Sequence, residues 1–378
     1  MSLTHITNDN IISMASSKLT GTLPVIDGSN LTGVDDVTKS ASDPATDTNP
    51  SGGVGTVWLN TTSGELFSCT DATTDENVWV NVGGGDGDVQ PWIFQGTISG
   101  YAVGGHQGGS TPYDNIIEKY SFVSDQNSTD VGDLTLGRNT PAGTSSSTHG
   151  YSSSGGGNNV IDKFSFSVDG DATDVGDLIA VNDQLTGQSS STHGYVSGGA
   201  AGGYLDTIQK FTVASDANAT DVGNLTLARG GCAGHSSTTH GYTSGGEAGS
   251  TNVIDKFTFA SDADATDVGD LTSARHGVTG QSSATNGYTT GTTFSTGTDR
   301  IDKFSFSSDS NAANIGTTTS GRYGANSSSS TTHGYYAGGY DSAYSNVIDK
   351  FSFSVDENGT DIADLTVARY GMNVGQQY

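Results

Sequence analysis

A short aromatic motif that recurs six times limits how this chain can fold. In each copy a lysine precedes an apolar–polar–apolar triplet, and successive copies are 44, 47, 46, 47 and 47 residues apart. The copies are EKYSF at 118–122, DKFSF at 162–166, QKFTV at 209–213, DKFTF at 255–259, DKFSF at 302–306 and DKFSF at 349–353. A near-constant period of this length indicates a repeat architecture, in which neighbouring units bury one another's apolar faces.

One complete unit, residues 240–285, reads as four short strands. HGYTSGG at 240–246 predicts a strand that ends at a double glycine, and NVIDKFTF at 252–259 alternates apolar and polar residues as a strand does. After a polar turn, VGDLTSAR at 268–275 predicts a further strand, and GVTGQSSAT at 277–285 leads into the next unit as the fourth. Four short antiparallel strands in each unit are typical of a propeller blade.

The two ends of the repeat region favour a closed ring. The last segment, at 365–378, stops before an HGY motif, whereas the first copy has GY at 100–101 without a preceding AR segment. Residues 369–378 can therefore supply the strand that the first copy lacks, which removes two exposed sheet edges. We predict an all-β fold with a six-bladed β-propeller at 91–378, an extended segment at 1–54 and a small β module with a Gly-rich linker at 55–90.

Double glycines follow the GY of the repeat in five copies. They are Gly104–Gly105, Gly155–Gly156, Gly198–Gly199, Gly245–Gly246 and Gly338–Gly339. With these glycines, residues 92–378 resemble the kelch and galactose-oxidase-like propellers, so a kelch-like propeller is expected. The copy at 287–292 departs from the pattern with GYTTGT, and the repeats lack the tryptophan that kelch blades usually carry after the double glycine.

The N-terminal part of the chain has a different composition. LTGTLPVIDGSNLTGV at 19–34 and the segment 55–85 resemble linker and β modules of bacteriophage tail fibres and other virion appendages. Trp58, Leu66, Phe67, Trp79 and Val82 are the predicted core of the small module. The resemblance implies a location on the phage particle, docking to other virion proteins through the N-terminal segment, and a homo-oligomer such as a trimer.

Charge and composition exclude several classes of partner. The net charge is −27, which disfavours nucleic-acid backbones because they are bound by clustered lysine and arginine. No apolar run approaches the length of a membrane span, so we expect no membrane insertion. Eleven of the 14 basic residues recur at equivalent positions in the repeats, where we expect ion pairs between blades.

The repeated histidines His149, His193, His240 and His333 occupy one blade position, and Asn286 takes the same place in a fifth copy. If they faced the channel of a propeller, they would form a pseudo-symmetric ring able to hold an anion or a metal. Asparagine at one copy suits hydrogen bonding better than metal ligation. We therefore favour a structural position and keep the ligand ring as the alternative.

Acidic turns recur after the aromatic motif. Two of them contain Asp169, Asp171 and Asp174, and Asp262, Asp264 and Asp267. The spacing could hold Ca²⁺ through carboxylate oxygens, although it lacks the EF-hand glycine and distal glutamate. Asp and Asn also close turns by accepting hydrogen bonds from their own backbone. Turn closure is the favoured interpretation, calcium is the alternative, and no other cofactor is expected.

Catalysis requires residues that break the repeat pattern. Those residues are His106, Cys232, His235, Glu247, His276 and Arg300. Their spacing forms no set of nucleophile, base and orienting group, so we do not expect an enzyme.

The loops beyond the double glycines differ most between copies and are expected on one face of the ring. They carry Tyr113, Tyr204, Phe294, Tyr340 and Tyr344, and aromatics among Ser, Asn and Gly suit carbohydrate or protein surfaces. The sequence thus predicts a phage tail fibre or adhesin whose propeller binds a host-surface glycan or protein. The alternatives are a virion decoration or neck/head fibre without a receptor, and a cellular kelch-like binding module or enzyme.

Overall fold

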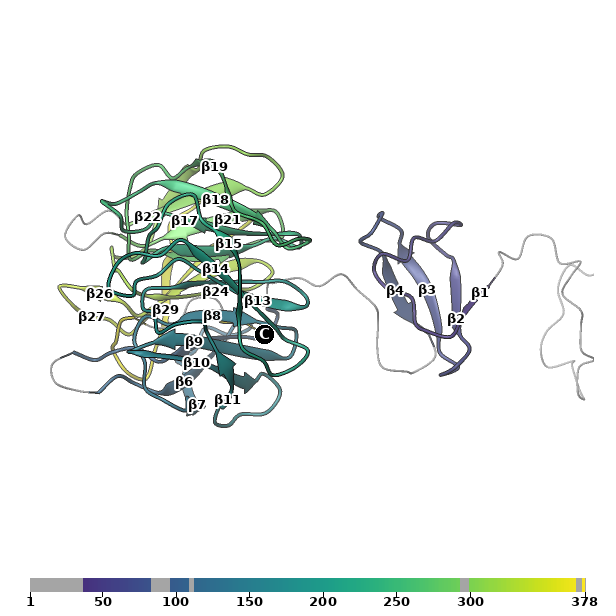
Figure 1. The fold of residues 1–378 in the computed structure, drawn as a ribbon, viewed down its shortest axis with the longest axis horizontal. Coiled ribbons are helices and arrows are strands. Elements are labelled where there is room, and N and C mark those ends of the chain that lie inside the picture. Colours follow the sequence, from purple (N-terminus) through teal and green to yellow (C-terminus); the bar gives the residue numbers. More distant parts are fainter. Residues whose placement is uncertain (1–36, 83–95, 109–111, 293–298, 372–375, 378) are drawn as a thin grey trace, which may run out of the picture. The chain divides into compact units, whose positions relative to one another are not determined.

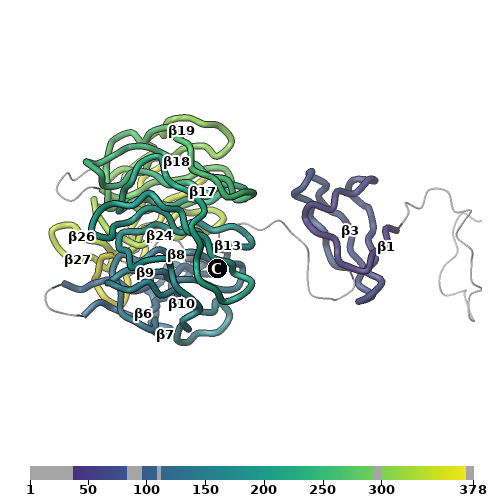
Figure 2. Tube along the Cα trace, viewed as in Figure 1, coloured from purple at the N-terminus to yellow at the C-terminus, as the bar shows by residue number. Residues whose placement is uncertain are grey.

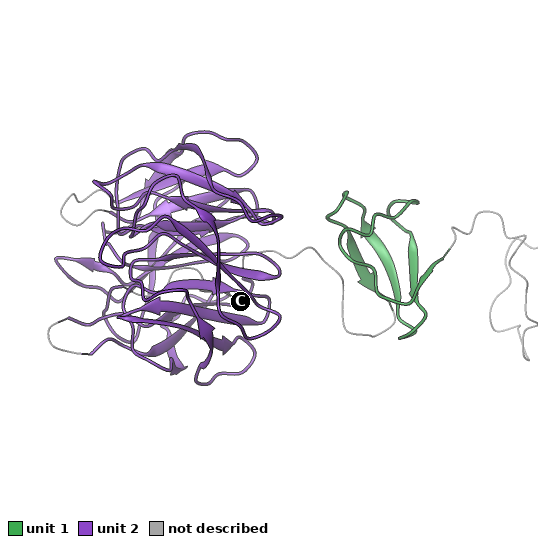
Figure 3. Cartoon of the chain, in the orientation of Figure 1, with its two compact units in different colours: residues 1–91 green, residues 92–378 purple. Residues whose placement is uncertain are grey.

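A computed structural model describes residues 37–82, 96–108, 112–292, 299–371 and 376–377. The chain divides into two compact units, residues 1–91 and 92–378 (Figure 3). All regular secondary structure among the described residues is β-strand, so the fold is all-β (Figure 1). In these ranges no helix has the length and apolar character that a membrane crossing requires.

The first unit holds one four-stranded sheet around a small aromatic core. Its strands, in sheet order, are β1 (Thr38–Ser40), β2 (Val57–Asn60), β3 (Leu66–Asp71) and β4 (Val78–Asn81). β1 runs parallel to β2, so the sheet includes residues that the sequence placed in the extended segment. Phe67, Cys69 and Trp79 are buried, and Trp58 meets Trp79 edge-on. The prediction of Val82 in this core is wrong, because Val82 lies beyond the end of β4 and is 57% exposed.

The described part of the second unit contains six four-stranded antiparallel sheets, which we number 1 to 6. Each sheet has a first, second, third and fourth strand in hydrogen-bonding order. The first strands are β30 (Gln376–Gln377), β8 (Ala142–Ser145), β12 (Thr186–Ser189), β16 (Ala233–Ser236), β20 (Thr279–Ser282) and β24 (Asn326–Ser329). The second strands are β5 (Ser99–Val103), β9 (His149–Gly155), β13 (His193–Ser197), β17 (His240–Ser244), β21 (Asn286–Thr290) and β25 (His333–Ala337).

The outer half of each sheet comes from the aromatic motif and the segment after the acidic turn. The third strands are β6 (Ile116–Ser121), β10 (Asn158–Ser165), β14 (Thr207–Thr212), β18 (Val253–Thr258), β22 (Arg300–Ser305) and β28 (Val347–Ser352). The fourth strands are β7 (Thr129–Asp133), β11 (Thr173–Asp177), β15 (Thr220–Asn224), β19 (Thr266–Asp270), β23 (Ala313–Thr317) and β29 (Thr360–Asp364). A further pair, β26 (Tyr340–Asp341) and β27 (Ala343–Tyr344), forms a small hairpin in sheet 6's long loop.

The six sheets follow one another in a cyclic order. Each first strand contacts the first strand of the next sheet from β8 to β24, β24 contacts β30 and β5, and β30 contacts β8. The C-terminal β30 pairs with β5, with Gln376 opposite Tyr101, so the two ends of the repeat region share sheet 1. The tube in Figure 2 follows the succession of sheets from blue through teal and green to yellow.

Small residues allow the first strands to pack backbone against backbone. A side chain at Gly187 would place its Cβ 2.0 Å from the Gly143 carbonyl oxygen of the preceding sheet. Side-chain hydroxyls bridge the same strands, for example from Ser189, whose Oγ accepts the Ser145 amide at 2.9 Å. The contacts between neighbouring first strands are therefore made by buried polar backbone and small side chains rather than by large apolar side chains.

The HGY motif serves the contacts between sheets. The glycine lies under the aromatic ring of the third strand, so a Cβ at Gly241 would lie 2.3 Å from Phe257 Cζ. The tyrosine points to the next sheet: Tyr242 packs on Phe304 and Phe306, and its hydroxyl donates to the Phe306 carbonyl oxygen at 3.4 Å. Each apolar cluster therefore combines residues of two sheets, which is how a repeat of four short strands obtains a core.

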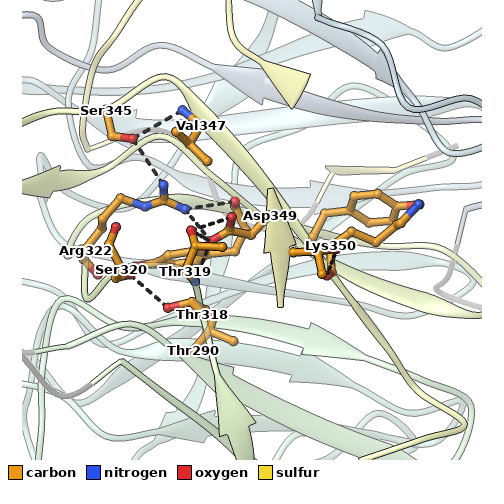
Figure 4. A network of polar contacts seen from close by, with 12 residues as sticks. Thr290, Thr318, Thr319, Ser320, Arg322, Ser345, Val347, Asp349 and Lys350 are labelled. Atoms are coloured by element: carbon orange, nitrogen blue, oxygen red, sulfur yellow. Dashed lines mark hydrogen bonds and ion pairs between the residues drawn. The ribbon is translucent and has the colours of Figure 1, made fainter. Parts of the chain in front are cut away.

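Buried ion pairs lie between neighbouring sheets. The residues that form them end the fourth strand earlier than the sequence predicted. The strand expected over 268–275 ends at Asp270, because the following Thr272 and Arg275 leave the sheet and bind Asp302 of the next one. Figure 4 shows the equivalent group, in which the Asp349 carboxylate accepts hydrogen bonds from Thr319 and Arg322. The five pairs are Arg138–Asp162, Arg229–Asp255, Arg275–Asp302, Arg322–Asp349 and Arg369–Glu118.

A second set of ion pairs lies nearer to solvent. The lysine of each aromatic motif reaches the first aspartate of the acidic turn in the following sheet. The six pairs are Lys119–Asp169, Lys163–Asp216, Lys210–Asp262, Lys256–Asp309, Lys303–Asp356 and Lys350–Asp125. The last pair joins sheet 6 to sheet 1, and the expectation that the repeated basic residues form ion pairs between repeats is confirmed.

Candidate functional site

Six equivalent residues, one ahead of the first strand of each sheet, are joined in a ring of hydrogen bonds. We call this set the rim ring: Thr140, Gln184, Gly231, Gly277, Gly324 and Gly371. Five links run from a backbone amide to the backbone carbonyl of the preceding member at 2.6–2.9 Å. The sixth runs from the Gln184 amide to the Thr140 hydroxyl at 3.1 Å.

The rim ring explains the glycine that precedes four of the six described first strands. All six residues have a left-handed backbone with φ between 54° and 68°. Glycine adopts this conformation without steric cost, whereas Thr140 and Gln184 are held in it despite their side chains. The same backbone geometry therefore recurs at each sheet while the residues around it vary.

A cavity of about 230 Å³, the rim cavity, lies against the rim ring. Its wall includes Thr140, Gln184 and four rim-ring glycines, and the small or apolar residues that follow rim-ring members, such as Leu185, Cys232 and Val278. Four larger polar or aromatic side chains complete the lining: Glu247, His276, Tyr323 and Tyr370. The cavity thus combines an apolar floor with a few polar groups, as small-molecule sites do.

Backbone bridges bring these larger side chains to the rim. At three places, the residue before a rim-ring member forms an antiparallel backbone bridge with the residue directly after a double glycine. Gly230 pairs with Glu247, Tyr323 with Tyr340, and Tyr370 with His106. The same backbone arrangement is thus repeated, but the residues at the equivalent positions differ between sheets. The side chains that it presents at the cavity are therefore asymmetric.

Five tyrosines and a histidine form a continuous aromatic group at one side of the rim cavity. We call it the tyrosine cluster: His106, Tyr113, Tyr323, Tyr340, Tyr344 and Tyr370. Tyr344 and Tyr370 stack with their centroids 5.6 Å apart, and Tyr323 lies 5.5 Å from Tyr370. His106 bridges the group to Tyr113, which is 43% exposed.

Burial affects the ionisation of two members of the tyrosine cluster, Tyr323 and Tyr370. Burial, followed by the neighbouring Tyr370, Tyr340 and Tyr344, raises the pKa of Tyr323 to about 12. Burial also raises the pKa of Tyr370. These two phenols therefore stay protonated at neutral pH and offer hydroxyl groups and ring faces to a ligand. Burial raises the pKa of the Cys232 thiol to about 11, which keeps this residue of the cavity wall a thiol rather than a thiolate nucleophile.

Four of the aromatic residues predicted from the loops lie around this site. Tyr113, Tyr340 and Tyr344 belong to the tyrosine cluster, and Tyr204, 39% exposed, hydrogen-bonds the Glu247 side chain. Phe294 lies outside the described residues. Sequence reasoning missed Tyr323 and Tyr370, although both stand directly before a rim-ring glycine in the sequence RYG, as His276 does in RHG.

The four repeated histidines lie elsewhere. Each begins a second strand, at the opposite end of that strand from the double glycine, and is partly buried. Each Nδ1 lies 2.8 Å from the hydroxyl of the preceding threonine, and Asn286 makes the matching bond to Thr285. Burial, followed by the nearby third-strand lysine, lowers the pKa of all four: His149, His193, His240 and His333.

The carboxylates of the acidic turns have partners within the protein. Asp169 and Asp262 pair with lysines of the preceding sheet, and Asp171 and Asp264 accept backbone amides of that sheet's fourth strand at 3.0 and 2.9 Å. The third carboxylate of each turn accepts a local amide at 3.1 Å, Asp174 from Gly176 and Asp267 from Gly269. Among the described residues, no group of three or more His, Cys, Asp or Glu side chains is arranged to hold a metal ion.

No protein-family model matches the chain, and no curated protein shows significant similarity to it.

Proposed function

We propose that residues 92–378 are a six-bladed β-propeller that binds a host-surface saccharide at the rim cavity, in a virion appendage protein. The propeller interpretation is supported by six equivalent four-stranded sheets and by three cyclic sets of contacts: those of the first strands, the lysine–aspartate pairs and the rim ring. A propeller presents its variable loops around one end of the ring, and ligand sites at such places are built from a few polar groups on a rigid frame.

The observation that carries the binding proposal is the tyrosine cluster beside the rim cavity. Tyrosine combines a flat apolar face, against which a sugar ring can stack, with a hydroxyl that can bond the sugar's hydroxyls. Glu247 and His276 add further hydrogen-bonding groups in the cavity wall. These residues break the repeat pattern and gather at one place, whereas the repeated residues are used in contacts between sheets.

The virion assignment rests on the N-terminal resemblance to phage appendage modules at 19–34 and 55–85. In such a protein the N-terminal segment would dock to other virion proteins, and several copies would present their propellers to one cell. Multivalent presentation raises overall binding strength without requiring a tight single site. A modest cavity of about 230 Å³ is compatible with that arrangement.

The proposal is tested by measuring how the full-length protein and its Tyr370→Ala and Tyr344→Ala variants bind bacterial cells and a panel of bacterial surface glycans. We expect each truncation to weaken binding about tenfold, as removal of an aromatic contact at the centre of a site does. Val168→Ala is the control, because Val168 is 69% exposed and precedes an acidic turn, at the other end of its sheet from the rim ring. Absence of binding across hosts would favour a virion decoration without a receptor.

A further inference from the structure

The charges of the second unit indicate which saccharides the rim cavity can take. In the described region, eleven of its lysine and arginine side chains each form an ion pair with an aspartate or glutamate. The arginines of these pairs are fully buried beneath the surface. The remaining basic residue, Arg300, lies 3.4 Å from the Thr272 hydroxyl and is not part of the cavity wall.

Among the described residues, the wall of the rim cavity therefore holds a carboxylate but no lysine or arginine side chain. Glu247 is the acidic residue of its wall, and its described side-chain contact is with the neutral phenol of Tyr204. No lysine or arginine lines the cavity in the part of the chain that the structure describes. A phosphate, sulfate or carboxylate group would find no lysine or arginine in the described wall and would meet the negative charge of Glu247.

The tyrosine cluster adds a second reason to expect a cation. The face of a tyrosine ring attracts a positive charge, so rings and a carboxylate that line one cavity can bind an ammonium group together. Tyr323 and Tyr370 line the same cavity as Glu247, and Tyr340 and Tyr344 pack directly against them. Burial raises the pKa of Tyr323 and Tyr370, so these two phenols stay protonated beside the cavity.

On the basis of the function proposed above, we propose that the rim cavity binds a saccharide that carries a positively charged amino group. The ammonium group lies against the Glu247 carboxylate and the tyrosine rings, and the sugar ring lies against the apolar part of the wall. The net charge of −27 adds a long-range attraction for such a ligand and repels anionic polymers.

The test compares two probes that differ at the amine alone: a short oligosaccharide of glucosamine and its N-acetylated counterpart. Calorimetry with the full-length protein, below the pKa of the sugar amine, should give about tenfold tighter binding of the amine form. Glu247→Gln should remove that preference, because it removes the carboxylate that faces the ammonium group. Glu357→Gln is the matched control, since it removes the same charge from an exposed acidic turn.

The outcomes separate this inference from the proposed function. Equal or tighter binding of the acetylated probe, or an unchanged preference in Glu247→Gln, overturns the amine inference but leaves a neutral-sugar site. Binding of neither probe also overturns the inference. If, in addition, Tyr370→Ala binds host cells as tightly as the unmodified protein, the rim cavity is not the receptor site and the proposed function fails with it.

Discussion

Arg369 and Glu118 form a buried ion pair between residues 251 positions apart, with 2.6 Å between Arg369 Nη2 and Glu118 Oε2. Arg369 follows the last strand of sheet 6, and Glu118 lies on the third strand of sheet 1. The Glu118 carboxylate also accepts hydrogen bonds from the amide and hydroxyl of Thr366. The junction between the two ends of the repeat region is therefore built like the internal junctions that carry the pair.

Arg369→Met should lower the free energy of unfolding by about 3–5 kcal/mol, because it leaves the fully buried Glu118 carboxylate without its cation. Urea denaturation of the full chain measures the loss. Lys350→Met is the control at the same junction, since the Lys350–Asp125 pair also joins sheet 6 to sheet 1 but Asp125 is 50% exposed. That variant should lose less than about 1 kcal/mol. Equal losses of stability in the two variants would contradict the conclusion that the buried Arg369–Glu118 pair, rather than the exposed lysine pair, stabilises this junction.

The junction between sheets 2 and 3 replaces the ion pair with neutral residues at all three positions. Ile179, Asn182 and Gln209 stand where other junctions have threonine, arginine and a carboxylate. Gln209 Oε1 accepts the Ile179 amide at 2.8 Å, which matches the bond from the Thr135 amide to Asp162. The carboxylate and the arginine are thus absent together, and neither charge is left buried alone.

Introducing one charge at this junction should therefore be costly, and introducing all three residues should restore stability. We expect Gln209→Asp alone to lose about 2–4 kcal/mol, and addition of Ile179→Thr and Asn182→Arg to recover most of it. Thermal and urea unfolding of the single, double and triple variants give the coupling free energy. Strictly additive effects would show that the three positions do not form one unit.

The sequence predicted the repeated strands well because the alternation of apolar and polar residues repeats six times. It did not predict where strands such as β19 end. The strand stops at Asp270, since Thr272 and Arg275 leave the sheet and bind Asp302 in the next repeat. The site was predicted in part: the loop tyrosines were visible as departures from the repeat. Tyr323 and Tyr370 were missed, because their arrival at the cavity depends on the left-handed rim ring, which leaves only a following glycine in the sequence.

The glycine of the HGY motif should be intolerant of a side chain. In Gly241→Ala the new Cβ would lie 2.3 Å from Phe257 Cζ, and Phe257 is buried, so the ring or the backbone must move. We expect a loss of about 1–3 kcal/mol in urea denaturation, the usual cost of overpacking. Gly170→Ala is the control, since no atom lies within 4 Å of its Cβ position. It should change stability by less than about 0.5 kcal/mol.

His235 should make the fold sensitive to mild acid. It is fully buried, with Nε2 2.9 Å from the Ser244 hydroxyl and Nδ1 3.1 Å from the Gln281 carbonyl oxygen. Burial lowers its pKa to about 4, from the usual value of 6.5. Because the unfolded chain binds the proton first, the contribution of neutral His235 is complete above pH 6.5 and is lost as the pH falls towards 4. The loss amounts to about 3 kcal/mol at 1.36 kcal/mol per pKa unit.

His235→Gln isolates this effect, because glutamine occupies the equivalent position in two other sheets. Gln188 Nε2 donates to the Ser197 hydroxyl at 2.9 Å, as the histidine ring meets Ser244. Urea denaturation between pH 7 and pH 4 should show a shallower loss of stability in the variant, by about 3 kcal/mol over the range. A residual loss should remain, since burial also lowers the pKa of the four histidines at the starts of the second strands. Parallel pH profiles in the two proteins would show that His235 is not buried in its neutral form.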